Sequence, residues 1–342
     1  MGSVGWAGVD LFFVLSGYLI GRQIAMPLAR NESWSAGRFF ARRLLRTLPN
    51  YLVVLLGYLL FPGPPIGGSG TAPLWRFLTF TQNFGLAYGQ TFTHSWSLCI
   101  EEQFYLVLPA AALVFARWGR SPSMAWAALA IGVALGAIAR GIAYTQHGHV
   151  AFDAEVYYST FCRFDELVPG LAIAVFESFH PALFDTVRRH GNALMAAGIL
   201  SSVAVLYCIV TEVLGPSFTS TFGFSLLAIA FAMLTLAALN PTSLLHRVRV
   251  PGASSLALWS YASYLVHKPL FMALAPQIAK WHMIAASWPV IVGMMTGGVG
   301  AGWLLFRFVE TPFMRLRSCW FPSRPHGGDA ARSPGNPVAA QA

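Results

Sequence analysis

The basic residues of this chain alternate between the two sides of a series of apolar stretches, and this alternation constrains the fold more than any other feature. Nine stretches are apolar enough to be predicted membrane spans, at residues 6–22, 48–62, 96–116, 122–142, 161–178, 191–212, 218–239, 254–277 and 284–308. Most of the 22 Lys and Arg residues lie in the connections on one side. The other side holds only Arg76, Arg140, Arg163, Lys268 and Lys280. Because cytoplasmic connections are enriched in Lys and Arg, the chain is predicted to begin outside and to end in the cytoplasm.

The composition supports a membrane protein. Hydrophobic residues make up 56% of the chain and charged residues only 10%, whereas soluble domains average about 25% charged residues. The predicted fold is therefore all-α, a polytopic transmembrane bundle of nine spans. The formal charge of +9 is spread over successive cytoplasmic connections, so membrane lipids with anionic headgroups, and no nucleic acid, are the expected partners. The four cysteines show no CxxC pair or metal-ligand spacing, and no metal site is expected.

Two segments outside the predicted spans have distinctive compositions. The outer segment 71–93 is too polar to span but rich in aromatic residues, and it is predicted to lie at the membrane interface. Its aromatic residues include Trp75, Phe77, Phe80, Phe84, Tyr88 and Phe92. Residues 1–320 are predicted to form one transmembrane domain, and residues 321–342, dominated by Pro, Gly, Ala and Ser, a disordered cytoplasmic tail.

The predicted topology leaves the start of the chain unexplained. Nothing precedes the first span to carry an outside N-terminus across the membrane, and no Lys or Arg stands ahead of it as in a signal anchor. One further upstream helix, beginning in the cytoplasm, would remove the difficulty. The chain is therefore predicted to lack its first span.

Ionisable residues inside the spans are the first candidates for chemistry, because a charge at mid-bilayer costs about 2.5–3.5 kcal/mol on insertion scales. The predicted topology places Asp10, Glu101, Asp165 and His267 in the same outer leaflet. A shared polar cavity that opens outward is the predicted arrangement. Separate helix-packing contacts, such as an ion pair between Asp10 and Lys268, are the alternative.

Arginines gather in the first cytoplasmic connection. Arg38, Arg42 and Arg46, or Arg43 and Arg46, share a helical face at i, i+3 or i+4 spacing. This face is predicted either to bind phosphates bidentately or to form a basic collar for anionic lipid, and spacing alone does not separate the two. Acids outside and arginines inside predict a protein that takes an activated, phosphorylated donor from the cytoplasm and serves an acceptor across the membrane.

A series of motifs, in order along the chain, resembles a known family. The run GVDLFFVLSGYLI at 8–20 closely resembles the second-helix signature of the acyltransferase-3 family, the bacterial integral-membrane acyltransferases typified by O-antigen and exopolysaccharide acetylases. Further matches are RRLLRTLP at 42–49, HSWSLCIEEQFY at 94–105, RFD at 163–165 with PG at 169–170, and SYASYLVH at 260–267. The ending VETPF at 309–313 is also similar, so the resemblance covers about residues 5–317.

The resemblance implies a bundle of about ten helices in the bacterial inner membrane. Such a protein moves an acyl group, commonly acetyl, from cytoplasmic acyl-coenzyme A to a hydroxyl of a saccharide, a lipid-linked sugar or a related acceptor. Acyl-coenzyme A is then a donor substrate, and no permanently bound cofactor is implied. In the family the first helix carries a basic residue and, eleven positions on, a histidine regarded as the catalytic base. No such pair precedes Asp10, which leaves a misplaced start, a truncation or an inactive member as open interpretations.

The resemblance also implies roles for residues that are present. The candidate catalytic set is Glu101, Asp10 and His267, with Glu101 expected to orient the base or to hold acceptor hydroxyls. Arg43 and Arg46 are expected to bind the phosphates of coenzyme A. The full set of expected substrate-binding residues is Arg42, Arg43, Arg46, His94, Trp96, Glu102, Asp165, Tyr261 and Tyr264. Glu102 ranks behind Glu101 because adjacent helical residues point about 100° apart.

Two other functions stay open at this point. Intramembrane acids and a histidine also fit a proton-coupled transporter or a flippase of a lipid-linked sugar. A chain without its first helix also fits an inactive scaffold. A transporter often carries an internal repeat that pairs interrupted helices, and no repeat is visible among the nine stretches.

Overall fold

The computed structural model describes residues 5–64, 66–118, 121–148, 152–280, 284 and 287–322. Every regular element in this part of the chain is helical and none is a strand, which confirms the all-α prediction. The longer helices are α1 (Ala7–Ala29), α2 (Ala36–Leu60), α4 (Trp96–Arg117), α5 (Pro122–His147), α7 (Val168–Phe179), α9 (Gly191–Thr211), α10 (Pro216–Ala238), α12 (Ala253–Lys280), α13 (Trp288–Leu305) and α14 (Thr311–Trp320). The shorter ones are α3 (Leu74–Leu78), α6 (Thr160–Arg163), α8 (Pro181–Arg188) and α11 (Leu244–Arg247). The predicted tail lies outside the described residues apart from its first two positions.

The described helices define a multi-pass membrane protein. Six are long and apolar enough to cross a membrane, namely Ala7–Ala29, Thr93–Arg117, Pro122–His147, Gly191–Thr211, Pro216–Ala238 and Trp288–Trp320. A seventh candidate is the bent pair Thr160–Phe179 and Pro181–Arg188. Only 11% of the most apolar window of α5, and the same share of α9, is buried within the protein. Both helices therefore present most of their apolar surface outward, where it can contact lipid.

Helix α2 begins well before the apolar stretch predicted at 48–62. It starts at Ala36, where the Ser35 hydroxyl accepts a hydrogen bond from the backbone N–H of Arg38 (3.4 Å) and caps the helix. The helix continues through Pro49, which lies at the start of the predicted span. The arginine-rich stretch is therefore the first part of α2, in agreement with its helical spacing.

The span predicted at 161–178 is a broken element. It consists of α6, a short 3-10 turn at Phe164–Glu166 and α7. Helix α8 follows after His180, at an angle of 117° to the preceding segment. Pro169 and Pro181 each lie in the first turn of a helix, where a missing N–H costs least and a preceding helix is interrupted. The break exposes backbone and places charged side chains within the bundle.

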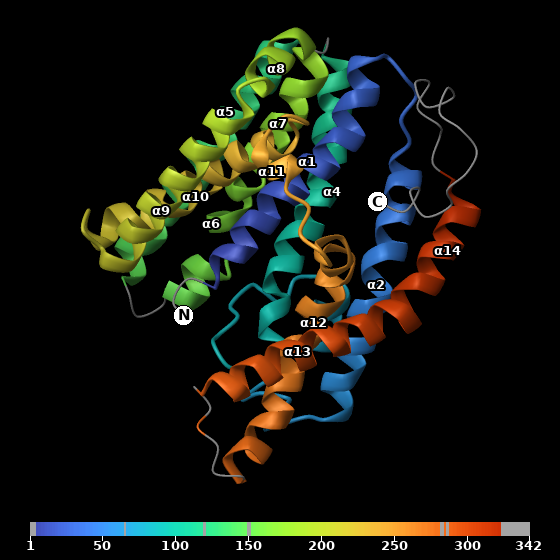
Figure 1. Ribbon diagram of the computed structural model, residues 1–342, viewed down its shortest axis with the longest axis vertical. Helices are drawn as coiled ribbons and strands as arrows, with labels where there is room; N and C mark the ends of the chain where they lie inside the picture. The colour runs from blue at the N-terminus through green and yellow to red at the C-terminus, as the bar shows by residue number, and fades with distance from the viewer. Residues whose placement is uncertain are drawn as a thin grey trace.

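The helices form two groups joined through α4 (Figure 1). In the first group, α1 packs on α7 and α10, and α10 also packs on α5 and α9. In the second group, α12 packs on α13 and α2, and α2 also packs on α14. Helices α1 and α7 approach so closely that a Cβ at Gly17 would lie 2.0 Å from the carbonyl oxygen of Leu167, and one at Gly170 would lie 1.9 Å from that of Val14. Only glycine fits at these two positions.

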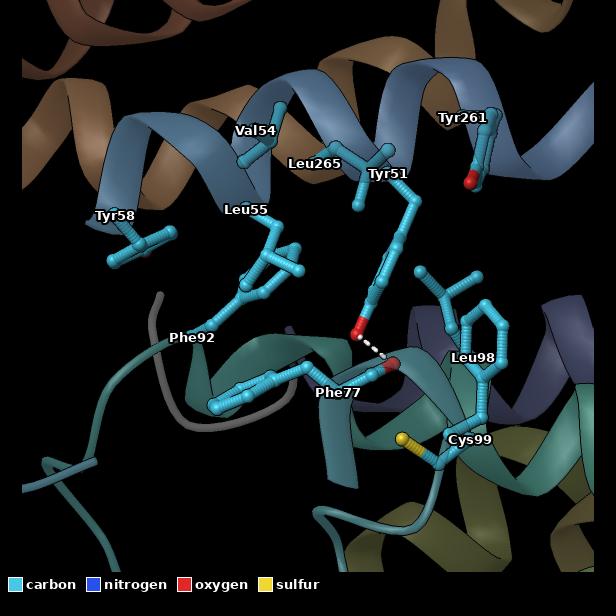
Figure 2. Packing of buried hydrophobic residues seen from close by; sticks show 11 residues of the cluster. Tyr51, Val54, Leu55, Tyr58, Phe77, Phe92, Leu98, Cys99, Tyr261 and Leu265 are labelled. Carbon is cyan, nitrogen blue, oxygen red and sulfur yellow. Dashed lines mark hydrogen bonds between the residues drawn. The ribbon is translucent and has the colours of Figure 1, made fainter. Parts of the chain in front are cut away.

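The segment between α2 and α4 folds back into the bundle. Figure 2 shows Phe77 and Phe92 packed below α2. The Tyr51 ring stacks on Phe92 at 5.2 Å between centroids, and the Tyr51 hydroxyl donates to the Phe77 carbonyl (3.0 Å). Tyr51 lies about 14 Å along α2 from its end at Leu60, at a rise of 1.5 Å per residue. The segment therefore enters the bundle to that depth.

This fold corrects the interfacial prediction for 71–93. Phe77, Phe80 and Phe92 are buried in the bundle, because each finds aromatic or aliphatic partners on α2 and α4. Trp75 and Tyr88 are exposed, as an interfacial position requires. The residues that lead into α4, Thr93–Ser95, are also buried, so α4 begins inside the bundle.

Candidate active site

One face of α4 carries a row of polar side chains through the middle of the protein. Ser97, Glu101 and Tyr105 are four residues apart, a spacing that places them on the same side of a helix. All three are buried. We call this row the α4 polar face. It contacts α12 at Ser97, α2 at Glu101 and α1 at Tyr105.

At the centre of this face, Arg43 of α2 bridges Glu101 and Tyr105. Its Nη2 lies 3.4 Å from Glu101 Oε2 and donates to the Tyr105 hydroxyl at 2.7 Å. The guanidinium also stands 4.1 Å from the centroid of the Tyr105 ring. Tyr105 donates to the same Oε2 (2.8 Å), and the Ser16 hydroxyl of α1 bonds to both. Glu101 Oε1 is buried without a hydrogen-bond partner among the described residues.

Glu102 shares the same arginine. Its Oε1 lies 3.7 Å from Arg43 Nε, whereas Glu101 faces Nη2 of the same guanidinium. The angle between adjacent helical residues was expected to keep Glu102 away from Glu101. Arg43 lies near both carboxylates despite that angle, because its guanidinium carries several donors in a broad fork.

The contact between Arg43 and Glu101 also corrects the predicted separation of arginines and acids on opposite sides of the membrane. That prediction assumed that α4 begins at the surface. Because the preceding segment enters the bundle, Glu101 lies deeper than expected and meets Arg43 two turns into α2. The acid and the arginine therefore form one cluster.

The other two arginines of the motif, Arg42 and Arg46, lie toward α14. Arg42 Nη1 donates to the backbone carbonyl of Phe321 (2.7 Å), just after α14. Arg46 is exposed on the surface of the protein and has Glu310 as a charged neighbour. Glu310 is buried and accepts a hydrogen bond from Asn50 (2.7 Å). Arg317 of α14 adds a third guanidinium, with Arg42, Arg46 and Glu310 among its charged neighbours.

At the other end of the α4 polar face lies a histidine cluster, formed by His94, Ser97, Tyr264 and His267. The rings of His94 and His267 meet edge to face at 5.4 Å. The Tyr264 hydroxyl bonds to Ser97 Oγ (2.8 Å) and donates to the backbone carbonyl of His94. His267 Nδ1 donates to the Tyr264 carbonyl (2.7 Å). The expected site residues His94, Tyr264 and His267 are therefore neighbours.

Tyr261, one turn before Tyr264 on α12, connects α12 to α2. Its hydroxyl donates to the backbone carbonyl of Thr47 (2.8 Å), one turn beyond Arg43. Both Arg43 and Glu102 are among its charged neighbours. Tyr261 therefore lies beside the Arg43 cluster, as a substrate-binding residue at that site would.

Asp10 belongs to a different cluster. Its Oδ1 bonds to Arg163 Nη2, and Arg163 Nε lies 2.7 Å from Glu166 Oε1. The side chains of all three are fully buried. The guanidinium of Arg163 also lies 3.8 Å from the centroid of the Phe224 ring and 5.3 Å from that of Trp96. The alternative pairing of Asp10 with Lys268 is wrong, because Asp10 is paired with Arg163.

Asp165 makes a second buried ion pair beside the first. Arg140 of α5 holds it bidentately, with Nη1 2.6 Å from Oδ1 and Nη2 3.0 Å from Oδ2, and the Ser225 hydroxyl of α10 donates to Oδ2 (2.6 Å). Arg140 and Arg163 were counted in outer connections, whereas both are fully buried in the bundle. The helix breaks around Arg163 and the extension of α5 to His147 bring them inside.

The four residues that the sequence placed in one shared cavity thus lie in separate groups, Glu101 with Arg43, Asp10 with Arg163, Asp165 with Arg140 and His267 with His94. Among the described residues, no hydrogen bond or ion pair joins Asp10 to Glu101, and each has its own arginine. Trp96 turns toward Arg163 and packs edge to face on Phe13 at 5.9 Å, away from the α4 polar face. Only the Arg43 cluster and the histidine cluster share the α4 polar face.

Four residues of these clusters were missed from the sequence. Ser16, Tyr105 and Glu166 contact candidate residues directly, and Arg317 approaches the motif arginines from α14. The i, i+4 spacing of Tyr105 after Glu101 was a usable signal. No signal in the sequence identifies the others, because their partners come from distant parts of the chain.

The fold and these clusters define a class of protein, a multi-pass helical membrane protein with a carboxylate, a guanidinium and a phenol in contact inside the bundle. The family model described as an acyltransferase domain matches residues 3–307, so the chain belongs to the acyltransferase-3 family.

Two similar relatives carry names that concern O-acetylation. The peptidoglycan O-acetyltransferase OatA of Listeria monocytogenes is 29% identical over 331 residues, which cover 91% of this chain and 51% of the relative. The O-acetyltransferase OatA of Staphylococcus aureus is 26% identical over 332 residues, 92% of this chain and 53% of the relative. The chain spans about half the length of these relatives. Neither name mentions lipopolysaccharide, and no solved structure matches the chain.

Proposed function

We propose that this chain is a membrane O-acetyltransferase that moves an acetyl group from cytoplasmic acetyl-coenzyme A to a hydroxyl of a cell-envelope polysaccharide. The contact of Arg43, Glu101 and Tyr105 within the bundle carries the proposal, because an isolated charged group there would be costly and this cluster leaves Glu101 Oε1 unpartnered. The name of the Listeria monocytogenes relative favours peptidoglycan as the acceptor. The alternative acceptors are other saccharides or lipid-linked sugars.

The proposed topology has nine spans in a bacterial cytoplasmic membrane. The six apolar helices and the bent pair account for seven, and α2 and α12, with 25 and 28 residues, are long enough to supply the other two. The chain then begins outside and ends in the cytoplasm, as the positive-inside rule indicates. The burial of Arg140 and Arg163 supports this orientation, since it removes two of the few basic residues from the outer side.

The proposed donor site lies between α2 and α14. Arg42, Arg46 and Arg317 bring like charges together, with Glu310 as an acidic neighbour of Arg317. Such an arrangement is favourable when an anion is bound, and guanidinium groups match phosphate oxygens bidentately. The pyrophosphate and the ribose phosphate of acetyl-coenzyme A provide this charge.

In the proposed reaction, the acceptor hydroxyl attacks the thioester carbonyl, the C–S bond breaks, and the thiol of coenzyme A leaves with the proton. Glu101 Oε1 is the oxygen free to accept a hydrogen bond from the acceptor hydroxyl. Arg43 and Tyr105 hold Glu101 through Oε2, and Arg43, which has further N–H donors, can also donate to the developing oxyanion. Asp10 and Asp165 are proposed to act through the ion pairs that fix the bundle.

The experiment measures transfer of labelled acetyl from acetyl-coenzyme A to glycan by membranes that contain the protein. Glu101→Gln is expected to lower transfer by about 10²- to 10⁴-fold, and Arg46→Ala to raise the KM for the donor. Glu32→Gln, in the exposed connection between α1 and α2, is the matched control. Unchanged transfer in both site variants would contradict the proposal.

A proton-coupled transporter or flippase is the second candidate. The observation in its favour is the fully buried group of Asp10, Glu166 and Arg163, which holds more acids than arginines. Intramembrane carboxylates of this kind occur in proton relays. Proton uptake into sealed vesicles that depends on Asp10, in the absence of acyl transfer, would favour this candidate.

A further inference from the structure

One ring nitrogen of His94, in the histidine cluster, is a hydrogen-bond acceptor without a donor among the described residues. His94 Nε2 lies 2.9 Å from the backbone carbonyl of Leu265. A carbonyl oxygen only accepts hydrogen bonds, so this nitrogen carries the proton of the neutral imidazole. Nδ1 is then the acceptor atom of His94. It is buried, and no group among the described residues donates to it.

A complementary group lies on the neighbouring ring. The Tyr58 hydroxyl of α2 is also buried and has no hydrogen-bond partner among the described residues. The Tyr58 and His94 rings are 6.2 Å apart between centroids, and both pack against Phe92. Figure 2 shows Tyr58 and Phe92 side by side at the end of α2. Buried polar atoms are satisfied in the great majority of cases, so these two unpaired atoms on nearby rings require a partner from outside the described residues.

We propose that Tyr58 and His94 form a binding site for one hydroxyl group of the acceptor saccharide. A hydroxyl group both donates and accepts, and the site offers one donor, the Tyr58 O–H, and one acceptor, His94 Nδ1. A phosphate or a carboxylate only accepts and leaves Nδ1 unpaired. An ammonium group only donates and leaves the tyrosine unpaired. The pair of atoms therefore fits the hydroxyl group of an alcohol better than it fits an anion or an ammonium group.

The position of the site extends the proposed function, on which this inference rests. His94 precedes Glu101 by two helical turns, about 10 Å along α4. Ser97 and Tyr264 lie between them and add further hydroxyl groups along the same face. A saccharide that lies along the α4 polar face places one hydroxyl at Tyr58 and His94 and another at Glu101. The site thus recognises an acceptor with several hydroxyls.

The experiment compares two tyrosines on the same face of α2. Tyr58→Phe removes a hydroxyl that has no partner in the described part of the chain, and Tyr51→Phe removes one that donates to the Phe77 carbonyl. The purified protein in lipid vesicles is assayed with labelled acetyl-coenzyme A and soluble peptidoglycan glycan fragments. Tyr58→Phe is expected to raise the KM for the glycan about tenfold, the effect of one hydrogen bond, with the donor KM and the thermal midpoint retained. Tyr51→Phe is expected to lower the thermal midpoint and to leave the glycan KM unchanged.

A second variant and a binding measurement separate this inference from the proposed function. His94→Gln can still donate to Leu265 but loses Nδ1, and it is expected to raise the glycan KM as Tyr58→Phe does. If the wild-type protein transfers no acetyl, direct binding of the same glycan fragments is measured, and Tyr58→Phe is expected to weaken it about tenfold. Equal glycan KM or binding in the wild-type protein and both site variants would show that water alone occupies the site and would overturn the inference.

Discussion

The bidentate ion pair of Arg140 and Asp165 is predicted to be a main determinant of stability. Arg140 donates to Asp165 at 2.6 and 3.0 Å and to the Thr221 carbonyl at 2.9 Å, and both charged side chains are fully buried. Arg140→Met keeps an unbranched apolar side chain and removes the charge and all of these donors. Among the described residues, the Asp165 carboxylate then keeps a hydrogen bond from the Ser225 hydroxyl alone.

The expected cost follows from this burial. An uncompensated buried charge destabilises a protein by about 3–5 kcal/mol, which is far more than the loss of an exposed ion pair. Arg140→Met and Asp165→Asn are each expected to lower the free energy of unfolding by about that amount. The double variant is expected to cost no more than the worse single variant, because it removes both charges together.

The assay is reversible unfolding of the purified protein in mixed micelles, with the three variants as a double-mutant cycle. Arg188→Met, which breaks the exposed pair with Asp185, is the matched control and is expected to cost at most about 1 kcal/mol. Additive single effects of below about 1 kcal/mol would refute the reasoning, since they would show that the buried pair is not coupled.

Three further predictions concern the donor site, the helix contact and the Arg43 cluster. Arg317→Ala is expected to raise the KM for acetyl-coenzyme A about tenfold through loss of one phosphate contact. Arg30→Ala, in an exposed position after α1, is expected to leave this KM unchanged. Equal KM values in the two variants would contradict the donor site. Gly17→Ala forces a Cβ to 2.0 Å from a backbone oxygen and is expected to cost about 1–3 kcal/mol or more of unfolding free energy. Gly8→Ala in the same helix meets nothing within 4 Å and is expected to be neutral or slightly stabilising, so a similar loss in both would refute the close contact. Tyr105→Phe is expected to lower kcat more than it raises either KM, and an unchanged kcat would remove Tyr105 from the site.

The sequence predicted the helices well because apolar length and charge are local properties. The stretches at 191–212, 218–239 and 254–277 differ from α9, α10 and α12 by three residues or fewer at each end. The predictions failed where contacts with another part of the chain determine whether a residue is buried. Segment 71–93 has the composition of an interfacial segment, and only the aromatic side chains of α2 explain why Phe77 and Phe92 are buried.

The candidate site was predicted in part. Glu101, Arg43 and Tyr261 were chosen as separate residues, and their proximity depends on the depth at which α4 begins. The sequence carries no measure of that depth. The grouping of Asp10 with Glu101 failed for a related reason, because residues in the same leaflet can face different helices. Arg163, 153 residues beyond Asp10 in the chain, is its ion-pair partner in the bundle.

The most direct test of the account is acetyl transfer across a sealed membrane. The protein is reconstituted in vesicles with labelled acetyl-coenzyme A enclosed and soluble peptidoglycan glycan fragments outside. The account predicts labelled ester on the outer glycan with the wild-type protein and with Glu32→Gln, and a loss of about 10²-fold or more with Glu101→Gln. Equal labelling of the glycan by the wild-type protein and Glu101→Gln, or none by either, would contradict it.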